Sequence, residues 1–361
     1  MYRTIVRPLL FRFKADTTHN EMVRWGRVAA GSTVLRHLAS WIYEVRAPEL
    51  EQEILGMHFR NPVGLAAGFD KNGDLTPLME AAGFGFVEVG SITANASVGN
   101  PLPRLFRLPD DQSLINRMGL NNDGADTIVK RLRKQTIQIP LGVNIAKTHD
   151  PGISGERALQ DYKKSFDRAS EVADYITINI SCPNTREGKT FEEPESLAAL
   201  LSHLQIDADE TLPPVFVKLS SDLDEHRLEE LIDVCRPCAI SGYVAVNTSS
   251  SRDGLQTAKQ TLQSIGEGGL SGRAIAGKRL RTIRMLSEKT RGEKPIIGVG
   301  GIFSTEDALE TIRAGADLIQ VYSGLVYEGP GLVRRINRGL RDHLRHEGLE
   351  HIWQIRSGKK P

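Results

Sequence analysis

Short apolar runs rich in Val, Ile and Ala recur along the chain from residue 60 onward, and most are bounded by Gly or Asn. Amphipathic patterns separate them, for example over 156–173, 225–234 and 304–314. Continuous apolar strands that alternate with amphipathic helices indicate a parallel sheet covered by helices. The predicted strands are 63–67, 86–89, 141–145, 175–180, 215–219, 243–246, 296–299 and 318–322.

Eight strand–helix units over about 270 residues fit a closed (β/α)8 barrel, also called a TIM barrel. An open doubly wound sheet is the alternative. The helix over 304–314 has clear ends, because Ser304 can cap its first turn, Glu306 and Asp307 follow, and Gly315 comes just after it.

Residues 1–48 have a different pattern, with eight Arg or Lys and apolar residues at helical spacing. This pattern predicts two short amphipathic helices with a basic face, and Asp16 with the two threonines after it offers a cap for the second. The segment is either a helical cap on the main domain or a module for a membrane surface or an apolar ligand. We therefore expect two regions, 1–48 and a barrel domain over 49–361.

Composition narrows the function classes. The 361 residues include 46 basic and 45 acidic ones, so no overall field favours nucleic acid. Three cysteines make no disulfide framework and suggest a reducing compartment. We expect neither a transmembrane helix nor a secretory signal, and the scattered histidines predict no metal site.

Polar residues gather where the predicted strands end, which in a barrel is the functional face. Asn144, Asn179 and Asn247 lie there, together with Lys71 and Lys218. An Asn amide both donates and accepts, so such a set suits a flat ring with N–H and C=O edges, such as a pyrimidine or an isoalloxazine. The lysines could stabilise negative charge on that ligand.

Residues 266–272, after the predicted strand 243–246, are expected to form a glycine-rich loop. Glycines also accompany the ends of the last two strands, at 298, 300, 301 and 324. They let backbone N–H groups approach an anion, and loops after strands 7 and 8 of a barrel commonly bind phosphate. The sequence therefore predicts a phosphate site there.

Taken together, these motifs resemble the dihydroorotate dehydrogenase family, and they run in order over nearly the whole chain. They are 64–73 (GLAAGFDKNG), 116–119 (NRMG), 179–185 (NISCPNT), 247–248 (NT), 269–272 (GLSG) and 300–302 (GGI). The N-terminal extension, including Phe11, Asp16 and His19, resembles the membrane-associated, quinone-dependent class 2.

The resemblance implies an FMN-containing barrel that oxidises dihydroorotate to orotate in pyrimidine (UMP) biosynthesis. The implied FMN contacts are Ala67, Gly68, Phe69, Asp70, Lys71, Ser91, Asn144, Asn179, Lys218, Val246, Gly272, Gly301, Tyr322 and Ser323. The implied substrate contacts are Lys71, Asn116, Arg117, Met118, Gly119, Leu120, Asn179, Asn184, Asn247 and Thr248.

Two positions depart from the class 2 pattern. Cys182 stands where that class usually has Ser, and Cys is the usual base of the soluble class 1 enzymes; Ser91 replaces a Thr. The resemblance implies that Cys182 takes a proton from C5 of dihydroorotate, while Lys71 lies near the substrate carboxylate and the flavin.

The resemblance also implies the partners. Electrons would pass to a quinone that enters through residues 1–48, and the protein would lie on the cytoplasmic side of the cell membrane as a peripheral protein. Two alternatives stay open: a class 1 type enzyme that uses fumarate or NAD, suggested by Cys182, and a phosphate-ligand-binding barrel without redox activity.

Overall fold

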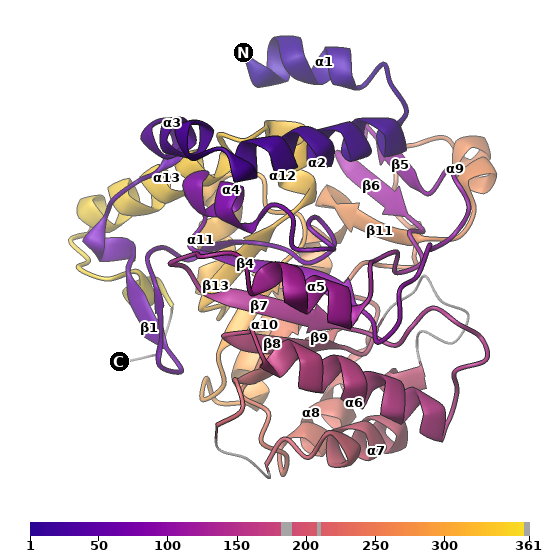
Figure 1. The fold of residues 1–361 in the computed structure, drawn as a ribbon. Coiled ribbons are helices and arrows are strands. Elements are labelled where there is room, and N and C mark those ends of the chain that lie inside the picture. The colour runs from indigo at the N-terminus through magenta and orange to yellow at the C-terminus, as the bar shows by residue number, and fades with distance from the viewer. Residues whose placement is uncertain (182–189, 208–210, 357–361) are drawn as a thin grey trace.

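The computed structural model describes residues 1–181, 190–207 and 211–356. Within them, eight parallel strands close into a barrel in chain order, with Ile319 of the last strand opposite Val63 of the first (Figure 1). The predicted barrel is therefore confirmed and the open sheet is excluded. The barrel strands are β3 (Val63–Leu65), β4 (Phe86–Ile92), β7 (Leu141–Ile145), β8 (Tyr175–Asn179), β9 (Val215–Leu219), β10 (Gly242–Ala245), β12 (Ile296–Val299) and β13 (Leu318–Val321).

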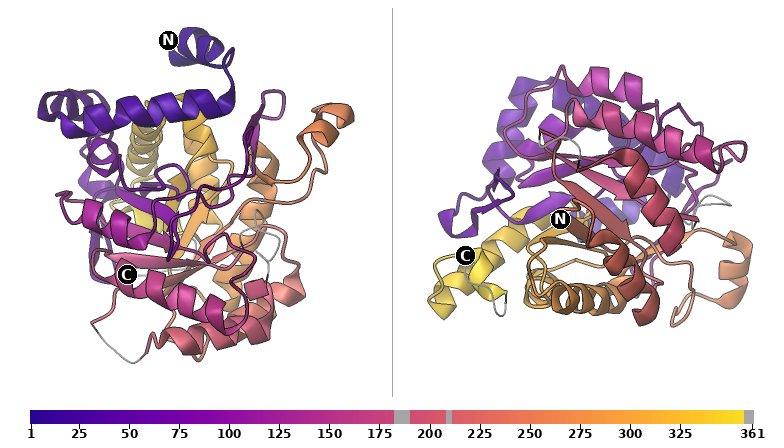
Figure 2. Two further views of the ribbon diagram at one scale, coloured as in Figure 1. Left: turned by 45° about the vertical axis from the view of Figure 1, so that its right-hand side comes forward. Right: turned by 90° about the horizontal axis from the view of Figure 1, so that it is seen from below.

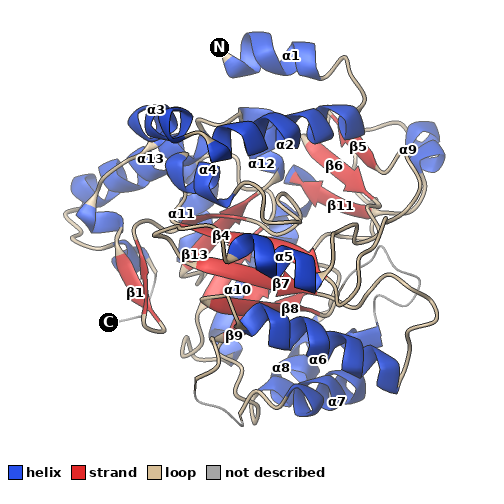
Figure 3. Cartoon of the chain, viewed as in Figure 1, coloured by secondary structure: helices blue, strands red, loops and turns tan. Residues whose placement is uncertain are grey.

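Helices cover the outside of the barrel (Figures 2 and 3). As predicted, Ser304 caps one of them, because its Oγ accepts from the Asp307 N–H at 3.2 Å. The covering helices are α4 (Thr76–Ala81), α5 (Ala125–Leu132), α6 (Glu156–Ser170), α7 (Pro194–Leu204), α8 (Glu225–Cys235), α10 (Ala276–Lys289), α11 (Thr305–Arg313) and α13 (Leu332–Glu347). Shorter helices are α9 (Lys259–Ile265), α12 (Ser323–Glu328), η2 (Pro48–Leu50), η3 (Thr190–Glu192), η4 (Arg273–Ile275) and η5 (Ile352–Ile355).

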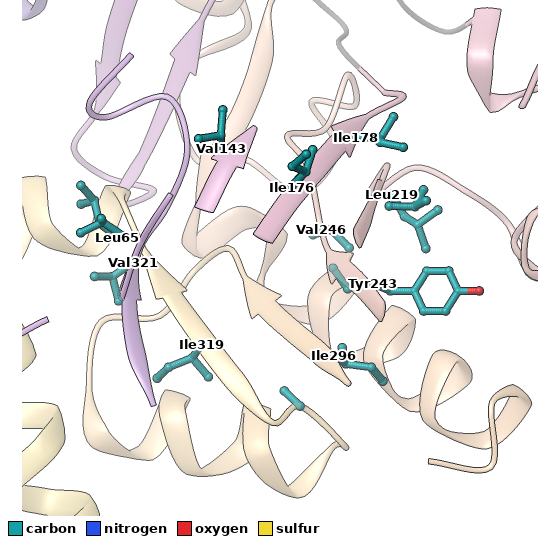
Figure 4. Close-up of a cluster of buried hydrophobic side chains, with 14 of the residues drawn as sticks. Leu65, Val143, Ile176, Ile178, Leu219, Tyr243, Val246, Ile296, Ile319 and Val321 are labelled. Carbon is teal, nitrogen blue, oxygen red and sulfur yellow. The ribbon is translucent and has the colours of Figure 1, made fainter. Parts of the chain in front are cut away.

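The main core lies between the strands and these helices, where outward-facing side chains such as Ile176 and Ile178 pack (Figure 4). Inside the barrel, aromatic rings fill the end where the strands begin. Tyr175 lies between Phe86 and Phe216, with ring centroids 6.4 and 5.4 Å away. Phe59 meets Phe86 at 5.5 Å and comes from a hairpin of β1 (Gln52–Ile54) and β2 (Met57–Phe59). This packing closes one end of the barrel and leaves the other for the site.

A small antiparallel sheet, which the sequence pattern did not predict, lies over that other end. It consists of β5 (Leu105–Leu108), β6 (Ser113–Asn116) and β11 (Gly269–Gly272), with Leu270 opposite Ile115. The strand β11 was expected to be a glycine-rich loop. Because its pairing partner, β6, is distant in the sequence, no local sequence pattern predicts this strand.

The N-terminal segment differs from expectation, because residues 1–43 form three helical segments rather than two. They are η1 (Tyr2–Val6) continuing into α1 (Arg7–Leu10), then α2 (Ala15–Gly31) and α3 (Thr33–Tyr43). Ser32 starts the third segment by accepting from the Leu35 N–H at 3.4 Å. The helices α2 and α3 pack on α4 across the top of the barrel in Figure 1.

The sequence suggested that Asp16 caps α2, but the structure shows that it does not. The helix begins at Ala15, so Asp16 already lies in its first turn. Its buried carboxylate instead accepts from the N–H groups of Arg104 and Leu105, at 3.3 and 3.4 Å. A tertiary partner at the start of β5 thus replaces the local one.

Candidate active site

A polar cavity of ≈ 140 Å³ opens at the carboxyl ends of the barrel strands, where barrels carry their active sites. Its roof includes Leu105, Leu114 and Ser271 from the antiparallel sheet. Thirteen of the predicted site residues line it, although they come from distant parts of the chain. They are Ala67, Gly68, Lys71, Ser91, Asn116, Met118, Leu120, Asn179, Lys218, Val246, Asn247, Thr248 and Tyr322.

Two lysines line this cavity, and their Nζ atoms have no hydrogen-bond acceptor among the described residues. Burial, with a smaller contribution from Arg104, lowers the pKa of Lys71 to about 8. Burial also lowers the pKa of Lys218, which is 5% exposed. A buried ammonium without a partner is costly, so an anionic or carbonyl-bearing ligand would stabilise both groups.

Asparagine amides form polar parts of the cavity wall: Asn179 and Asn247 come from the barrel, and Asn116 comes from the antiparallel sheet of the roof. Asn179 Oδ1 accepts from Asn247 Nδ2 at 3.1 Å, and Asn179 Nδ2 donates to Ser91 Oγ at 3.1 Å. Asn247 Nδ2 also donates to the Ser181 carbonyl at 2.8 Å, and Asn116 Nδ2 to the Gly269 carbonyl at 3.2 Å. These bonds fix each amide in one orientation. The wall can therefore match the N–H and C=O edges of a flat ring.

Gly272, Gly301 and Ser323 come together around Ser271. A Cβ on Gly301, whose φ is +69°, would lie 2.8 Å from the Gly272 carbonyl, and Ser271 Oγ lies 2.9 Å from Ser323 Oγ. In the described part of the chain, the Gly301 N–H meets no acceptor. A free backbone N–H group suits an anion, and the phosphate site at these residues stays a prediction. Within the same ranges, no cluster of His, Cys, Asp or Glu could hold a metal.

Two predicted flavin contacts in the loop after β3 do not line the polar cavity. The Phe69 ring packs edge-on against Tyr322 and His19, with centroids 5.5 and 6.1 Å away. Asp70 is buried and accepts from the Leu75 N–H at 2.7 Å, and burial raises its pKa to about 6. Both side chains shape this loop, and their contact with a flavin stays a prediction.

Three further predicted residues lie beside the cavity rather than on its wall. Asn144 is fully buried and hydrogen-bonded to Ser91 Oγ. The Arg117 guanidinium donates to the Pro103 carbonyl at 3.2 Å, and Gly119 adopts φ +68°. The Arg117 guanidinium is therefore already bonded within the protein, and the contacts of these three residues with a ligand stay predictions.

Cys182 and Asn184, the predicted base and one predicted substrate contact, lie outside the described residues. The chain reaches them from Ser181, whose N–H donates to Asn179 Oδ1 at 3.3 Å. Ser181 Oγ also accepts from Asn247 Nδ2 at 3.0 Å. Their roles stay predictions.

The sequence pattern missed polar groups inside the barrel. Glu88 and Gln320 are fully buried, and Gln320 Nε2 donates to Glu88 Oε2 at 2.7 Å. The sequence does contain a signal for them, because Glu88 and Gln320 are each a polar residue within an apolar strand. Both faces of such a strand are covered by protein, so a polar side chain there must be buried. Nothing local shows that the two residues meet.

An apolar cavity of ≈ 690 Å³ lies between the N-terminal helices and the barrel. Leu105, Leu114 and Tyr322 line both this cavity and the polar one. His19 also lines it, and burial lowers its pKa to about 3, with help from Lys71 and Arg104, so the ring is neutral. Further wall residues are Val6, Leu10, Phe11, Met22, Val23, Tyr43, Leu78, Met79, Ala82, Phe84, Leu325 and Val326.

The outer surface of the N-terminal helices is unusually apolar. In the described part of the chain, eleven of the fourteen exposed large apolar side chains lie within residues 1–41, including Phe13 (62% exposed), Trp25 (62%) and Trp41 (83%). Within the same part, no helix is long and apolar enough to cross a bilayer.

Comparison with known proteins identifies the family. A family model described as Dihydroorotate dehydrogenase matches residues 49–344. The chain is 42% identical over 357 residues to the dihydroorotate dehydrogenase (quinone) of Gloeobacter violaceus, covering 98% of both chains. It is 39% identical over 348 residues to the protein of the same name from Haloarcula marismortui, covering 96% of both.

Solved structures agree with this result. The ligand-free DHODH of Eimeria tenella matches with a TM-score of 0.83 and 32% identity, covering 95% of this chain and 99% of that one. The structure of DHODH from the same organism in complex with ferulenol gives a TM-score of 0.81 at 31% identity, with coverage of 91% and 96%. The chain therefore belongs to the dihydroorotate dehydrogenase family, whose members are flavin-dependent oxidoreductases.

Proposed function

We propose that the protein oxidises (S)-dihydroorotate to orotate in de novo pyrimidine (UMP) biosynthesis, with FMN as hydride acceptor and a membrane quinone as final electron acceptor. One observation carries the proposal: a polar cavity and an apolar cavity share the wall formed by Leu105, Leu114 and Tyr322. The first suits an anionic pyrimidine and the second suits an apolar acceptor. Relatives over the full length carry the name dihydroorotate dehydrogenase (quinone).

The residues present fit FMN. Gly272 and Gly301 lie close together, Ser323 lies beside them at Ser271, and the Gly301 N–H meets no acceptor among the described residues, so this group would hold the phosphate. Lys218 and Ser91 line the cavity where its ring would lie. When bound, FMN supplies the two-electron acceptor that takes a hydride from C6 of the substrate.

On the substrate side, Asn116, Asn179 and Asn247 present fixed amides to a pyrimidine ring. Lys71 supplies a positive charge for the substrate carboxylate. Cys182, which follows Ser181 in the sequence, would take the proton from C5, so that the double bond between C5 and C6 forms as the hydride leaves. A thiol suits this role because its reference pKa of about 8.5 lies near neutrality.

The N-terminal helices would connect the apolar cavity to a membrane. Their exposed tryptophans and basic residues suit a monolayer of anionic lipid, in which an amphipathic helix lies without spanning it. A quinone could then reach Tyr322 through apolar surroundings. We accordingly propose that the protein lies at the cytoplasmic face of the cell membrane as a peripheral protein.

The test uses purified full-length protein. We expect it to be yellow, and dihydroorotate added without oxygen should bleach the flavin band. Steady-state assays then compare a ubiquinone analogue, a menaquinone analogue, fumarate and NAD⁺ as acceptors, and we expect turnover with a quinone. Turnover with fumarate or NAD⁺ alone would support the class 1 alternative, and a colourless protein would support a barrel without redox activity.

A further inference from the structure

Glu88 is a buried carboxylate inside the barrel, between the aromatic layer and the polar cavity. It stands in β4, is 0% exposed, and accepts three hydrogen bonds. Asn144 Nδ2 donates to Oε1 at 2.8 Å, while Gln320 Nε2 and the Tyr175 hydroxyl donate to Oε2 at 2.7 and 3.2 Å. The three donors come from β7, β13 and β8, so one side chain ties four strands together.

A chain of hydrogen bonds connects Asn179 on the cavity wall to Glu88. In each of these bonds the donor is the residue nearer to Asn179 along the chain of bonds. Asn179 Nδ2 donates to Ser91 Oγ, Ser91 Oγ donates to Asn144 Oδ1, and Asn144 Nδ2 donates to Glu88. A carboxylate only accepts hydrogen bonds, so it turns the Asn144 amide nitrogen toward itself. Asn144 must then offer its oxygen to Ser91. The Ser91 hydroxyl therefore donates its hydrogen to Asn144, and its oxygen accepts a hydrogen bond from Asn179, which lines the cavity.

Glu88 also acts on Lys218, which stands in β9 on the cavity wall. The carboxylate favours the charged form of this lysine and opposes the effect of burial on its pKa. Lys218 donates no hydrogen bond to the described residues. The charge of Lys218 is therefore partly offset by the buried Glu88 carboxylate, while Lys218 itself lines the cavity.

We propose that Glu88 is a positioning residue for the flavin: it orients Ser91 and Asn144, and its negative charge offsets the field of the Lys218 ammonium at the isoalloxazine ring. This inference rests on the proposed function, because it requires FMN in the polar cavity. Reduction adds negative charge to a flavin, so more uncompensated positive charge at the ring favours the reduced form. Glu88 thus sets the reduction potential without touching the flavin.

The test is the equilibrium of full-length flavoprotein with a reference dye of known potential. Glu88→Gln keeps the shape and removes the charge, and we expect the ratio of reduced to oxidised flavin to rise about tenfold, which is about 30 mV for a two-electron couple. Thr177→Val is the matched control, because the buried Thr177 hydroxyl has no partner among the described residues. An unchanged potential in Glu88→Gln, or an equal shift in the control, overturns the proposal.

Glu88→Asp tests the orienting role separately and serves if Glu88→Gln does not fold. It keeps the charge but withdraws the carboxylate from Asn144, so FMN should dissociate about tenfold more readily, as when a hydrogen bond to a charged group is lost. The potential should stay near that of the parent. Unchanged FMN affinity would overturn the orienting role. Dye equilibration needs no dihydroorotate, so a failure of the proposed substrate would be seen separately, as a flavin that dyes reduce and dihydroorotate does not.

Discussion

The polar cavity and the apolar cavity share Leu105, Leu114 and Tyr322, yet they are built in opposite ways. The polar cavity takes its functional side chains from strand ends, where the parallel barrel fixes their positions. The apolar cavity lies between packed elements, with helices of residues 1–43 on one side and α4, β5 and α12 on the other. The first can bind a ligand by directed hydrogen bonds, whereas the second can select it mainly by size and apolarity.

The electrostatics of the two cavities differ in the same sense. Lys71 keeps a pKa of about 8 on the polar side and is therefore largely charged at neutral pH. His19, which faces the apolar cavity, has its pKa lowered to about 3 and is neutral. The charged Lys71 and the neutral His19 indicate that one wall separates a site for an anion from a site for a neutral, apolar molecule. Changes on either side should therefore affect one half-reaction at a time.

The largest effect is expected on the polar side, at the predicted base. Cys182→Ala should slow anaerobic flavin reduction by dihydroorotate roughly 10²–10⁴-fold, the usual contribution of a positioned base. Reoxidation by quinone should not change. Stopped-flow absorbance measures both steps, with Cys182→Ser as the conservative comparison. An Ala variant as fast as the parent would leave Cys182 without a catalytic role.

The matching change on the apolar side fills the second cavity. Leu78→Trp should slow quinone reoxidation about ten- to hundredfold, because the larger side chain takes volume from an apolar ligand and such a size mismatch costs about 1–3 kcal/mol. Flavin reduction by dihydroorotate should keep its rate. Val98→Trp is the control, since Val98 is 91% exposed and does not line this cavity. If Leu78→Trp slows both half-reactions equally, the two cavities do not act separately.

A smaller effect concerns pH and Lys71. Burial lowers the pKa of Lys71 from its ordinary value of 10.5 to about 8 in the folded protein. Orotate should therefore bind with constant affinity below pH 8 and about tenfold more weakly for each pH unit above it, as Lys71 loses its proton. The sign for stability is opposite: the ligand-free protein should gain stability as pH rises from 8 toward 10.5, because the costly buried charge disappears.

Orotate titrations of the flavin spectrum from pH 6 to 10 measure this dependence. Lys71→Arg is the matched variant, because a guanidinium stays charged over the whole range. We expect that variant to lack the decline above pH 8. A parent protein whose orotate affinity stays constant to pH 10 would show that Lys71 does not carry the anion site.

The smallest effect is expected at the membrane surface. Arg12 and Lys14 are exposed next to Phe13. Changing either to Gln should weaken binding to vesicles of anionic lipid about fivefold, since a basic residue near such a surface contributes about 1 kcal/mol. Sedimentation with vesicles measures this, with Lys130→Gln on α5 as control. Equal losses in the control would mean that the N-terminal helices are no special docking surface.

Local sequence patterns predicted the barrel strands, with an open doubly wound sheet as the alternative that the structure excludes. Eight apolar strands, their order and the helix cap at Ser304 follow from local periodicity and local hydrogen bonds, which need no knowledge of the rest of the chain. Because carboxyl ends of parallel strands meet at one end of a barrel, the sequence also indicated that Lys71, Asn179 and Lys218 would share a cavity, as they do.

Three features could not be predicted from local patterns, because each depends on a hydrogen-bonding partner that is distant in the sequence. Asp16 bonds to the start of β5 instead of capping its own helix, and β11 pairs with β6 although its glycines read as a loop. In the sequence, Glu88 is a charged residue within an apolar strand, and only the structure shows that Asn144 and Gln320 donate hydrogen bonds to it. A buried polar group needs a partner wherever the fold can supply one, and periodicity along the sequence carries no information about which partner arrives.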